Sequence, residues 1–189
     1  MTMDKITATD KVEAVTKYNT MPADTMGIGG HYTAVCYSVD GFIKWTDEIE
    51  NIVTTVGRNF TLDTAFGNTA GGAVVMGLKG TGTAIAADTQ ASHASWLEVG
   101  GTNAPAYSGN RPTPSFSAAS AGSKATSSSV SFSMTSSGTV AGCFINIGGS
   151  STKDSTTGTL FSAGDFSSSK SVVNGDTIAV TYTATLTAT

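Results

Sequence analysis

The stretch TIAVTYTATLTAT (residues 177–189) has the most regular pattern in the chain. Apolar residues alternate there with threonine at almost every second position, and a period of two is typical of a strand with one buried face. At about 3.3 Å per residue the segment would span about 40 Å, more than an ordinary strand, so we expect it to bend or to run past the core. The apolar series is Ile178, Val180, Tyr182, Ala184, Leu186 and Ala188.

Further strands and turns surround this segment. Asn174-Gly175 precedes it, and Asp40-Gly41 joins two strand-like runs, both pairs being typical of hairpin turns. The run VSFSMT (130–135) alternates again, whereas AVVMGL (73–78) does not and is expected to be covered on both faces. Short strands separated by turns favour an antiparallel sandwich or barrel, and we predict an all-β, antiparallel β-sandwich.

One segment interrupts the strands. VGRNFTLDTAFG (56–67) has helical spacing and ends at a glycine, which is a natural helix stop. We predict a short helical elbow there, and its buried side is expected to consist of Val56, Phe60, Leu62 and Phe66.

Residues 1–30 are predicted to form an extended N-terminal arm, and residues 31–189 the sandwich domain. Asp10 and Glu13 form a capping-box pattern at the start of a short amphipathic helix, and Pro22 and a glycine-rich linker follow. Such an arm is either a clasp for a partner or a frayed tail. Its expected partner contacts are Met3, Ile6, Val12, Val15, Tyr18, Met21 and Met26.

The composition narrows the classes of function. Only 13% of the residues are charged, against about 25% in typical soluble domains, and the net charge is -4. Nucleic-acid binding needs a basic face, so no nucleic-acid partner is expected. The N-terminus lacks the apolar core of a secretory signal, and apolar runs fall far short of the ~20 residues that span a bilayer. We therefore expect synthesis in a cytoplasm and no membrane partner.

The titratable residues suggest no catalytic or metal site. Asp47, Glu48 and Glu50 lie close in sequence, but on a strand Glu48 and Glu50 share one face and Asp47 takes the other. Charges that protect a sheet edge explain them as well as catalysis does. His31 and His93 have no metal-ligand spacing, and we expect His93 to pack or to bond locally, near Asp88. We predict a protein that is not an enzyme and has no cofactor, metal or catalytic residue.

The cysteines and aromatic residues leave alternatives open. Cys36 and Cys143 lie in apolar strands and fit two buried thiols, although a single disulfide stays possible. Four scattered aromatic residues fit packing in a core or interface better than a sugar-stacking platform. These four are Trp45, Trp96, Tyr107 and Phe116.

Several motifs together resemble a family of tailed-phage virion structural proteins that includes the capsid cement, or decoration, proteins of short-tailed phages. The resemblance covers about residues 31–185. It rests on NxVTxVGxNxxLD at 51–63, DTxASHAxW at 88–96 and GDFSxSxxVxxGDT at 164–177, in that order.

This resemblance implies a jelly-roll-like sandwich on the outer surface of an assembled phage head. The implied partner is the major capsid protein of the HK97-like fold, whose subunits such a protein bridges to stabilise the shell. We expect a homo-oligomer on the shell, either a dimer or a trimer. The alternative is a phage tail or fibre adhesin module that recognises a host surface glycan through an exposed aromatic pocket. A hydrolase of surface polysaccharide is the remaining alternative and would need two carboxylates in one cleft.

Overall fold

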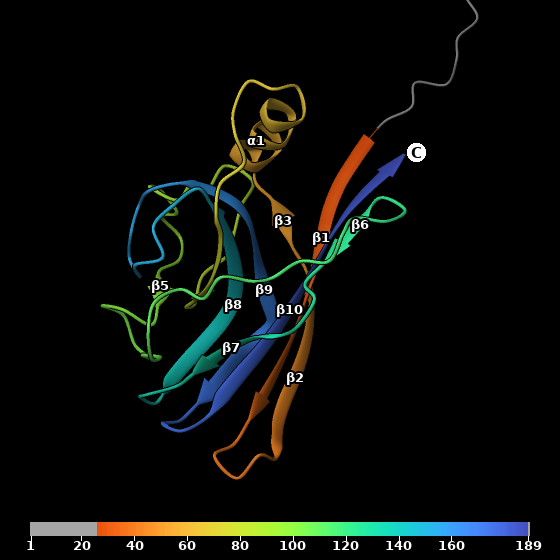
Figure 1. Ribbon diagram of the computed structural model, residues 1–189. Coiled ribbons are helices and arrows are strands. Elements are labelled where there is room, and N and C mark those ends of the chain that lie inside the picture. Colours follow the sequence, from red (N-terminus) through yellow and green to blue (C-terminus); the bar gives the residue numbers. More distant parts are fainter. Residues whose placement is uncertain (1–25, 189) are drawn as a thin grey trace, which may run out of the picture.

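The computed structural model describes residues 26–188, which form two antiparallel five-stranded sheets and one helix, α1 (Thr55–Ala65) (Figure 1). The first sheet has the order β2-β1-β10-β6, with β7 also paired to β10, and the second has the order β3-β9-β8-β4-β5. The predicted antiparallel β-sandwich is confirmed. The strands are β1 (Met26–Tyr37), β2 (Ile43–Glu50), β3 (Ile52–Val53), β4 (Val74–Lys79), β5 (Glu98–Val99), β6 (Ser123–Ala125), β7 (Val130–Ser133), β8 (Gly138–Ile147), β9 (Thr159–Val172) and β10 (Thr177–Ala188).

The long C-terminal strand, β10, forms a continuous antiparallel ladder with β1, from Thr177 opposite Tyr37 to Ala188 opposite Met26. Its alternation is as predicted over the first half, where Ile178, Val180 and Tyr182 are buried in the core. Beyond that point the strand becomes exposed, and Leu186 has 44% of its surface accessible. The strand therefore runs past the core, which was one of the two predicted outcomes.

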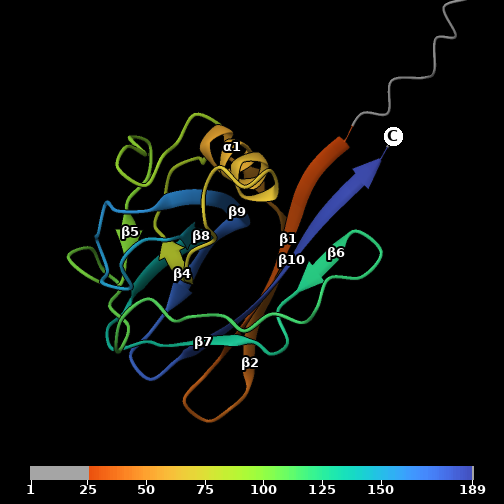
Figure 2. The same ribbon diagram turned by 45° about the horizontal axis from the view of Figure 1, so that its top comes forward.

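The main core lies between the two sheets, and a smaller apolar cluster covers the opposite face of the second sheet. Trp96, Phe144 and Leu160 belong to this smaller cluster. In Figures 1 and 2 the yellow-green loops around β5 lie on the side of β8 that faces away from β10. The second sheet is thus covered on both faces, which explains why β4 and β8 are buried almost continuously, as the lack of alternation in β4 predicted.

Helix α1 begins and ends close to the predicted positions. The Thr54 side chain accepts a hydrogen bond from the Gly57 amide at 3.0 Å and caps the first turn. The predicted buried side is wrong for Leu62 and Phe66, which are 48% and 84% exposed. The physical reason is that the helix turns the face around Gly57 towards the β9 backbone, and Leu62 and Phe66 lie away from that face. Val56 and Phe60 are half-buried.

The predicted boundary between arm and domain at residue 30 is also wrong. Residues 26–30 are strand, because Met26 to Gly30 pair with Ala188 to Ala184 of β10. Gly30 is needed for close packing, since a Cβ there would lie 2.3 Å from the Tyr182 hydroxyl oxygen. Met26 is 68% exposed. The other expected arm contacts lie outside the described residues: Met3, Ile6, Val12, Val15, Tyr18 and Met21.

Both cysteines are free and buried, which confirms the interpretation as two thiols. Burial, together with the nearby Asp176 carboxylate, raises the pKa of Cys36 to about 11, and burial raises the pKa of Cys143 further. Neither thiol is therefore activated as a thiolate near neutral pH.

The four aromatic residues are used in packing. Trp96 and Tyr107 are buried, whereas Trp45 and Phe116 are half-buried and pack against the main core. Trp45 also meets Phe166 edge-on, with ring centroids 5.5 Å apart. Packing, and not a sugar-stacking platform, accounts for all four.

Candidate functional site

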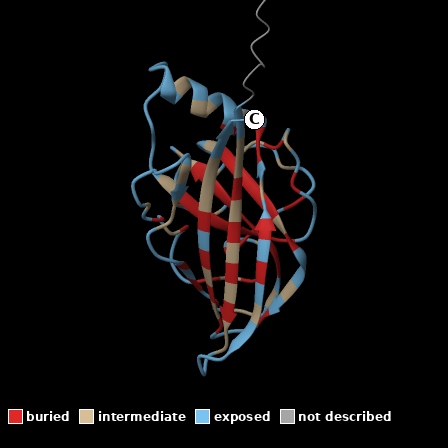
Figure 3. Ribbon diagram, turned by 90° about the vertical axis from the view of Figure 1, so that its right-hand side faces the viewer, coloured by how far each residue is buried: buried red, intermediate tan, exposed pale blue. Residues whose placement is uncertain are grey.

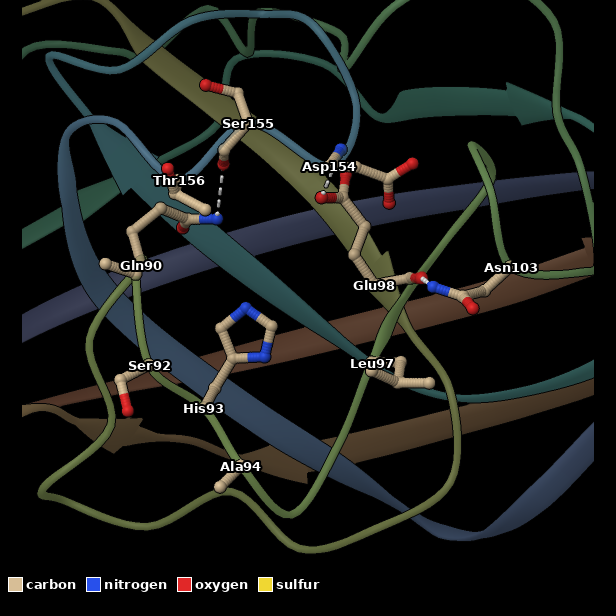
Figure 4. A pocket seen from close by; sticks show the side chains of 11 residues that line it. Gln90, Ser92, His93, Ala94, Leu97, Glu98, Asn103, Asp154, Ser155 and Thr156 are labelled. Carbon is tan, nitrogen blue, oxygen red and sulfur yellow. Dashed lines mark hydrogen bonds between the residues drawn. The ribbon is translucent and has the colours of Figure 1, made fainter.

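A polar pocket lies beside the loops that cover the second sheet (Figure 4). It has a volume of about 380 Å³. Figure 4 shows that its side chains come from three loop regions, around residues 90–94, 97–103 and 154–156. The polar and titratable residues of its wall include Gln90, Ser92, His93, Glu98, Asn103, Asp154 and Ser155.

Glu98 is bound into a buried ion pair with Arg111. The guanidinium Nε donates to one carboxylate oxygen at 2.8 Å and Nη2 donates to the other at 2.5 Å. Both residues are at most 3% exposed. The same guanidinium donates to the carbonyl oxygens of Ser150 and Ser155, and the Asp154 amide donates to Glu98. Glu98 thus joins three loops, and both of its carboxylate oxygens accept hydrogen bonds.

His93 and Asp88 serve the Trp96 side chain. The His93 ring stacks on the Trp96 indole with centroids 3.9 Å apart, and its Nδ1 lies 2.9 Å from the Trp96 carbonyl oxygen. The Trp96 Nε1 donates to the Asp88 carboxylate at 2.9 Å. Local packing of His93 is confirmed, although its bonding partner is Trp96 and not Asp88.

The early carboxylates separate as their alternation predicts. Glu48 and Glu50 point to solvent from β2, the edge strand of the first sheet, where they fit the role of edge charges. Asp47 is only 7% exposed and lies 2.7 Å from the Lys170 amine, while the Ser167 hydroxyl donates to it at 2.6 Å. Asp47 therefore connects β2 with β9 of the other sheet and is not a solvated edge charge.

This connection gives a pH-dependent prediction. Burial opposes the ionisation of Asp47, but the hydrogen bonds from Lys170 and Ser167 outweigh burial and lower the pKa of its carboxyl group. A lowered pKa in the folded state stabilises the protein above the pKa of the unfolded chain, near 4, and this contribution is lost as the pH falls through the folded pKa. We expect Asp47→Asn to reduce stability at pH 7 and to lose less further stability than the wild type between pH 5 and pH 2, measured by urea denaturation. If the variant and the wild type lost the same amount of stability between pH 5 and pH 2, this prediction would be contradicted.

The titratable groups of the described residues form no cluster typical of a metal site. Across residues 26–188, no three His, Cys, Asp or Glu side chains lie where they could hold one metal ion. Lys79, which is fully buried, donates to Asp165 at 2.5 Å and to the Gly82 carbonyl oxygen at 2.6 Å. No helix in the described part of the chain is long and apolar enough to cross a bilayer.

The most exposed apolar side chains of the strands and their turns gather at two places, and the first is the turn end of the sandwich. We call it the distal tip and define it by Val39, Phe42, Ile43 and Val173, which are 75%, 74%, 62% and 48% exposed. These residues flank the β1–β2 and β9–β10 turns, and the β1–β2 turn is the pale blue hairpin at the bottom of Figure 3.

The two turns of the distal tip are held together. The Lys44 amine in β2 donates to the carboxylate of Asp176, which is 1% exposed and also accepts from the Val173 amide at 2.8 Å. Within the first turn, the Gly41 amide donates to the Ser38 carbonyl oxygen at 2.9 Å. The apolar side chains therefore project from turns whose backbone is already ordered.

The second exposed apolar place is a groove between α1 and the free ends of β1 and β10. We call it the helical groove and define it by Met26, Ile28, Leu62, Leu186 and the lining residue Thr61. It lies at the opposite end of β1 from the distal tip, because Met26 starts that strand and Val39 lies two residues beyond its last residue, Tyr37.

Sequence reasoning missed the distal tip, although a signal was present. Turn residues are usually polar, yet Val39 and Phe42 directly flank Asp40-Gly41, and Val173 precedes Asn174-Gly175. The apolar residues beside these two hairpin turns could therefore have been used to predict an exposed contact surface.

Comparisons with known proteins do not assign the chain to a family. No family model matches the chain. No curated protein and no solved structure matches it either. The chain is thus defined by its fold and surfaces, as an antiparallel β-sandwich with an apolar tip at one end and an apolar groove at the other.

Proposed function

We propose that the protein is a capsid cement, or decoration, protein that binds the outside of an assembled phage head and bridges subunits of the major capsid protein. The observation that carries this proposal is the distal tip. Isolated exposed apolar residues are normal on a protein surface, but four of them on two turns that are bonded together favour a contact surface.

The physical case begins with the cost of binding. An ordered tip loses little conformational freedom when it docks, so the apolar area of Phe42 and Ile43 can contribute to affinity. With only 13% charged residues in the chain, docking would depend on shape fit and apolar contact more than on ion pairs. Because the shell offers many equivalent binding sites, a modest stabilisation by each bound copy adds up over the whole particle.

Bridging needs a second contact at a distance from the first. The twelve-residue strand β1 spans about 40 Å at about 3.3 Å per residue. In Figure 1 helix α1 lies at the end of the molecule opposite the β1–β2 turn, and its C-cap residue Phe66 is 84% exposed. We propose that the distal tip binds one capsid subunit and that the end of the molecule that carries α1 binds a neighbouring subunit. The protein would be present as a dimer or trimer on the shell.

The adhesin alternative would be favoured by an exposed aromatic platform. Trp96 and Tyr107 are buried in the core, and the ring at the polar pocket, His93, already stacks on Trp96. The two exposed phenylalanine rings of the described residues belong to different elements, Phe42 to the β1–β2 turn and Phe66 to the end of α1. We therefore favour decoration over glycan binding and propose a structural component.

The number of copies per particle tests the location of the protein. Quantitative mass spectrometry of purified virions would compare it with the major capsid protein. A number of copies close to that of the shell protein supports decoration. About a dozen copies would place it in the tail and overturn the proposal, and so would its absence from particles.

The distal tip itself gives a further prediction. Phe42→Ser should weaken binding to heads that lack the protein by about tenfold or more, because burying a phenylalanine side chain is worth about 1.5–3 kcal/mol. The measurement is a sedimentation assay with purified protein and particles.

A matched control comes from Leu97, which is 60% exposed and lies at the polar pocket. Leu97→Ser removes a similar exposed apolar side chain away from the distal tip and should leave binding unchanged. Equal affinities of the two variants would overturn the assignment of the distal tip.

A further inference from the structure

The fully buried side chain of Lys79 crosses the second sheet to reach a carboxylate. Its amine nitrogen lies 2.5 Å from Oδ1 of Asp165. The two residues belong to β4 and β9, and Figure 2 shows β8 with these two strands. Lys79 lies opposite Gly142 of β8, and Gly142 lies opposite Asp165, so the three residues share one row of the sheet. The two charged side chains therefore meet over a residue that has no side chain.

Backbone atoms hold both charged groups in this position. A Cβ on Gly142 would lie 2.9 Å from both Cγ and Cδ of Lys79, so a larger residue would displace the lysine chain from its path. The Gly82 carbonyl oxygen accepts a hydrogen bond from the lysine amine at 2.6 Å. The Ala84 amide donates to Oδ2 of Asp165 at 3.1 Å. The loop that follows β4 thus orients the amine and the carboxylate towards each other.

The amine is also shielded from water. It lies 5.6 Å from the centre of the Trp96 ring, which is almost fully buried in the smaller apolar cluster. The side chain of Asp165, in contrast, keeps 34% of its surface exposed. Burial disfavours the charged form of an amine, so it favours the passage of a proton from the ammonium group to the adjacent carboxylate.

We propose that Lys79 and Asp165 condense in the folded chain to an amide, an isopeptide bond between β4 and β9. A proton first passes from the ammonium group to the carboxylate, which gives a neutral amine and a carboxylic acid. The nitrogen then attacks the carboxyl carbon of Asp165, and the Ala84 amide stabilises the negative charge that develops on Oδ2. A second proton moves from nitrogen to Oδ1, the bond between Oδ1 and the carbon breaks, and one water molecule leaves. The reaction consumes no other reactant.

The geometry favours this condensation in three ways. A hydrogen bond from the amine to Oδ1 brings the nitrogen close to the separation of about 3–3.5 Å from which attack on the carboxyl carbon can occur. Because both groups are fixed in one sheet, the entropy cost of bringing them together has been met by folding. The exposed part of Asp165 gives the released water a route to solvent.

The inference concerns the free protein and does not depend on the proposed function. The bond would join positions that are 86 residues apart and would restrict the unfolded chain, as a disulfide does. A second lysine–aspartate pair, Lys44 with Asp176, provides a comparison within the same chain. Lys44 is 30% exposed, so its ammonium group stays hydrated and we expect no amide there.

Mass spectrometry of the full chain under denaturing conditions tests the proposal, because an ion pair dissociates on unfolding whereas an amide does not. We expect the intact mass to be lower than that of the unmodified chain by one water molecule. A tryptic digest should contain one branched peptide that includes both Lys79 and Asp165. In the same digest, Lys44 and Asp176 should be found in separate linear peptides.

Two variants complete the test. Lys79→Met removes the amine and should have the full mass of its own sequence, since the partly exposed Asp165 can then be hydrated. Lys124→Met changes an exposed lysine and should still lack one water molecule. A wild-type chain of full mass would overturn the proposal, and so would a loss of water that maps to other residues or persists in Lys79→Met.

The wild-type digest decides the question even if Lys79→Met does not fold. Because the readout involves no capsid, its failure leaves the decoration proposal to its own tests.

Discussion

Arg111→Met is expected to lower the free energy of unfolding by about 3–5 kcal/mol, because it leaves the buried Glu98 carboxylate without its counter-charge. The variant also removes the donors to the carbonyl oxygens of Ser150 and Ser155, so the loops around β5 and after β8 lose their common anchor. At about 2–4 °C per kcal/mol for a chain of this size, the melting temperature should fall by about 10 °C.

Urea denaturation with two further variants separates charge burial from loss of packing. The double variant Glu98→Leu/Arg111→Met removes both charges and should be more stable than Arg111→Met alone, because no unpaired charge stays buried. Arg58→Met changes the exposed arginine of α1 and should alter stability by no more than about 0.5 kcal/mol. A double variant no more stable than the single one would refute this explanation.

Gly57→Ala is expected to destabilise the protein by about 2 kcal/mol, against the usual effect of this change in a helix. In an exposed helix, alanine is more favourable than glycine by about 1 kcal/mol. At this position the added Cβ would lie 2.3 Å from the Phe161 carbonyl oxygen and 2.9 Å from its Cα, both backbone atoms of β9. The helix would have to move away from the second sheet, and the Thr54 cap would be disturbed with it.

Asn59→Ala is the matched control, since Asn59 is exposed in the same helix. It should stabilise the protein by a few tenths of a kcal/mol through helix propensity alone. Unfolding of both variants in urea gives the comparison. If Gly57→Ala is as stable as the wild type or more so, α1 does not depend on this close approach.

Strands and turns were predictable where the pattern is local. The alternation of β7 and β10 and the glycine turns at Gly41 and Gly175 have the structure that their spacing indicates. The helix boundaries were also close, because capping and stopping depend on neighbouring residues. The exposed positions of Leu62 and Phe66 were not predictable, because they depend on which face α1 turns towards β9.

The candidate surfaces were less predictable than the fold. Nothing local shows that Asp47 bonds to Ser167, which is 120 positions away, or that Lys44 in one hairpin holds Asp176 in the other. The apolar residues beside the turns were visible in the sequence, but their assembly into one distal tip required the pairing of β1 with both β2 and β10.

The sequence by itself determined an all-β chain with period-two strands, hairpin turns and the helix near residues 56–67. Those features depend on residue type and on near neighbours, so short stretches of the sequence are enough to predict them. The tertiary structure alone decided which charges are buried and paired, which face of each sheet is covered, and where apolar side chains stay exposed. The physical reason is that burial is set by contacts between segments far apart in the chain, and only the packed sheets bring those segments together.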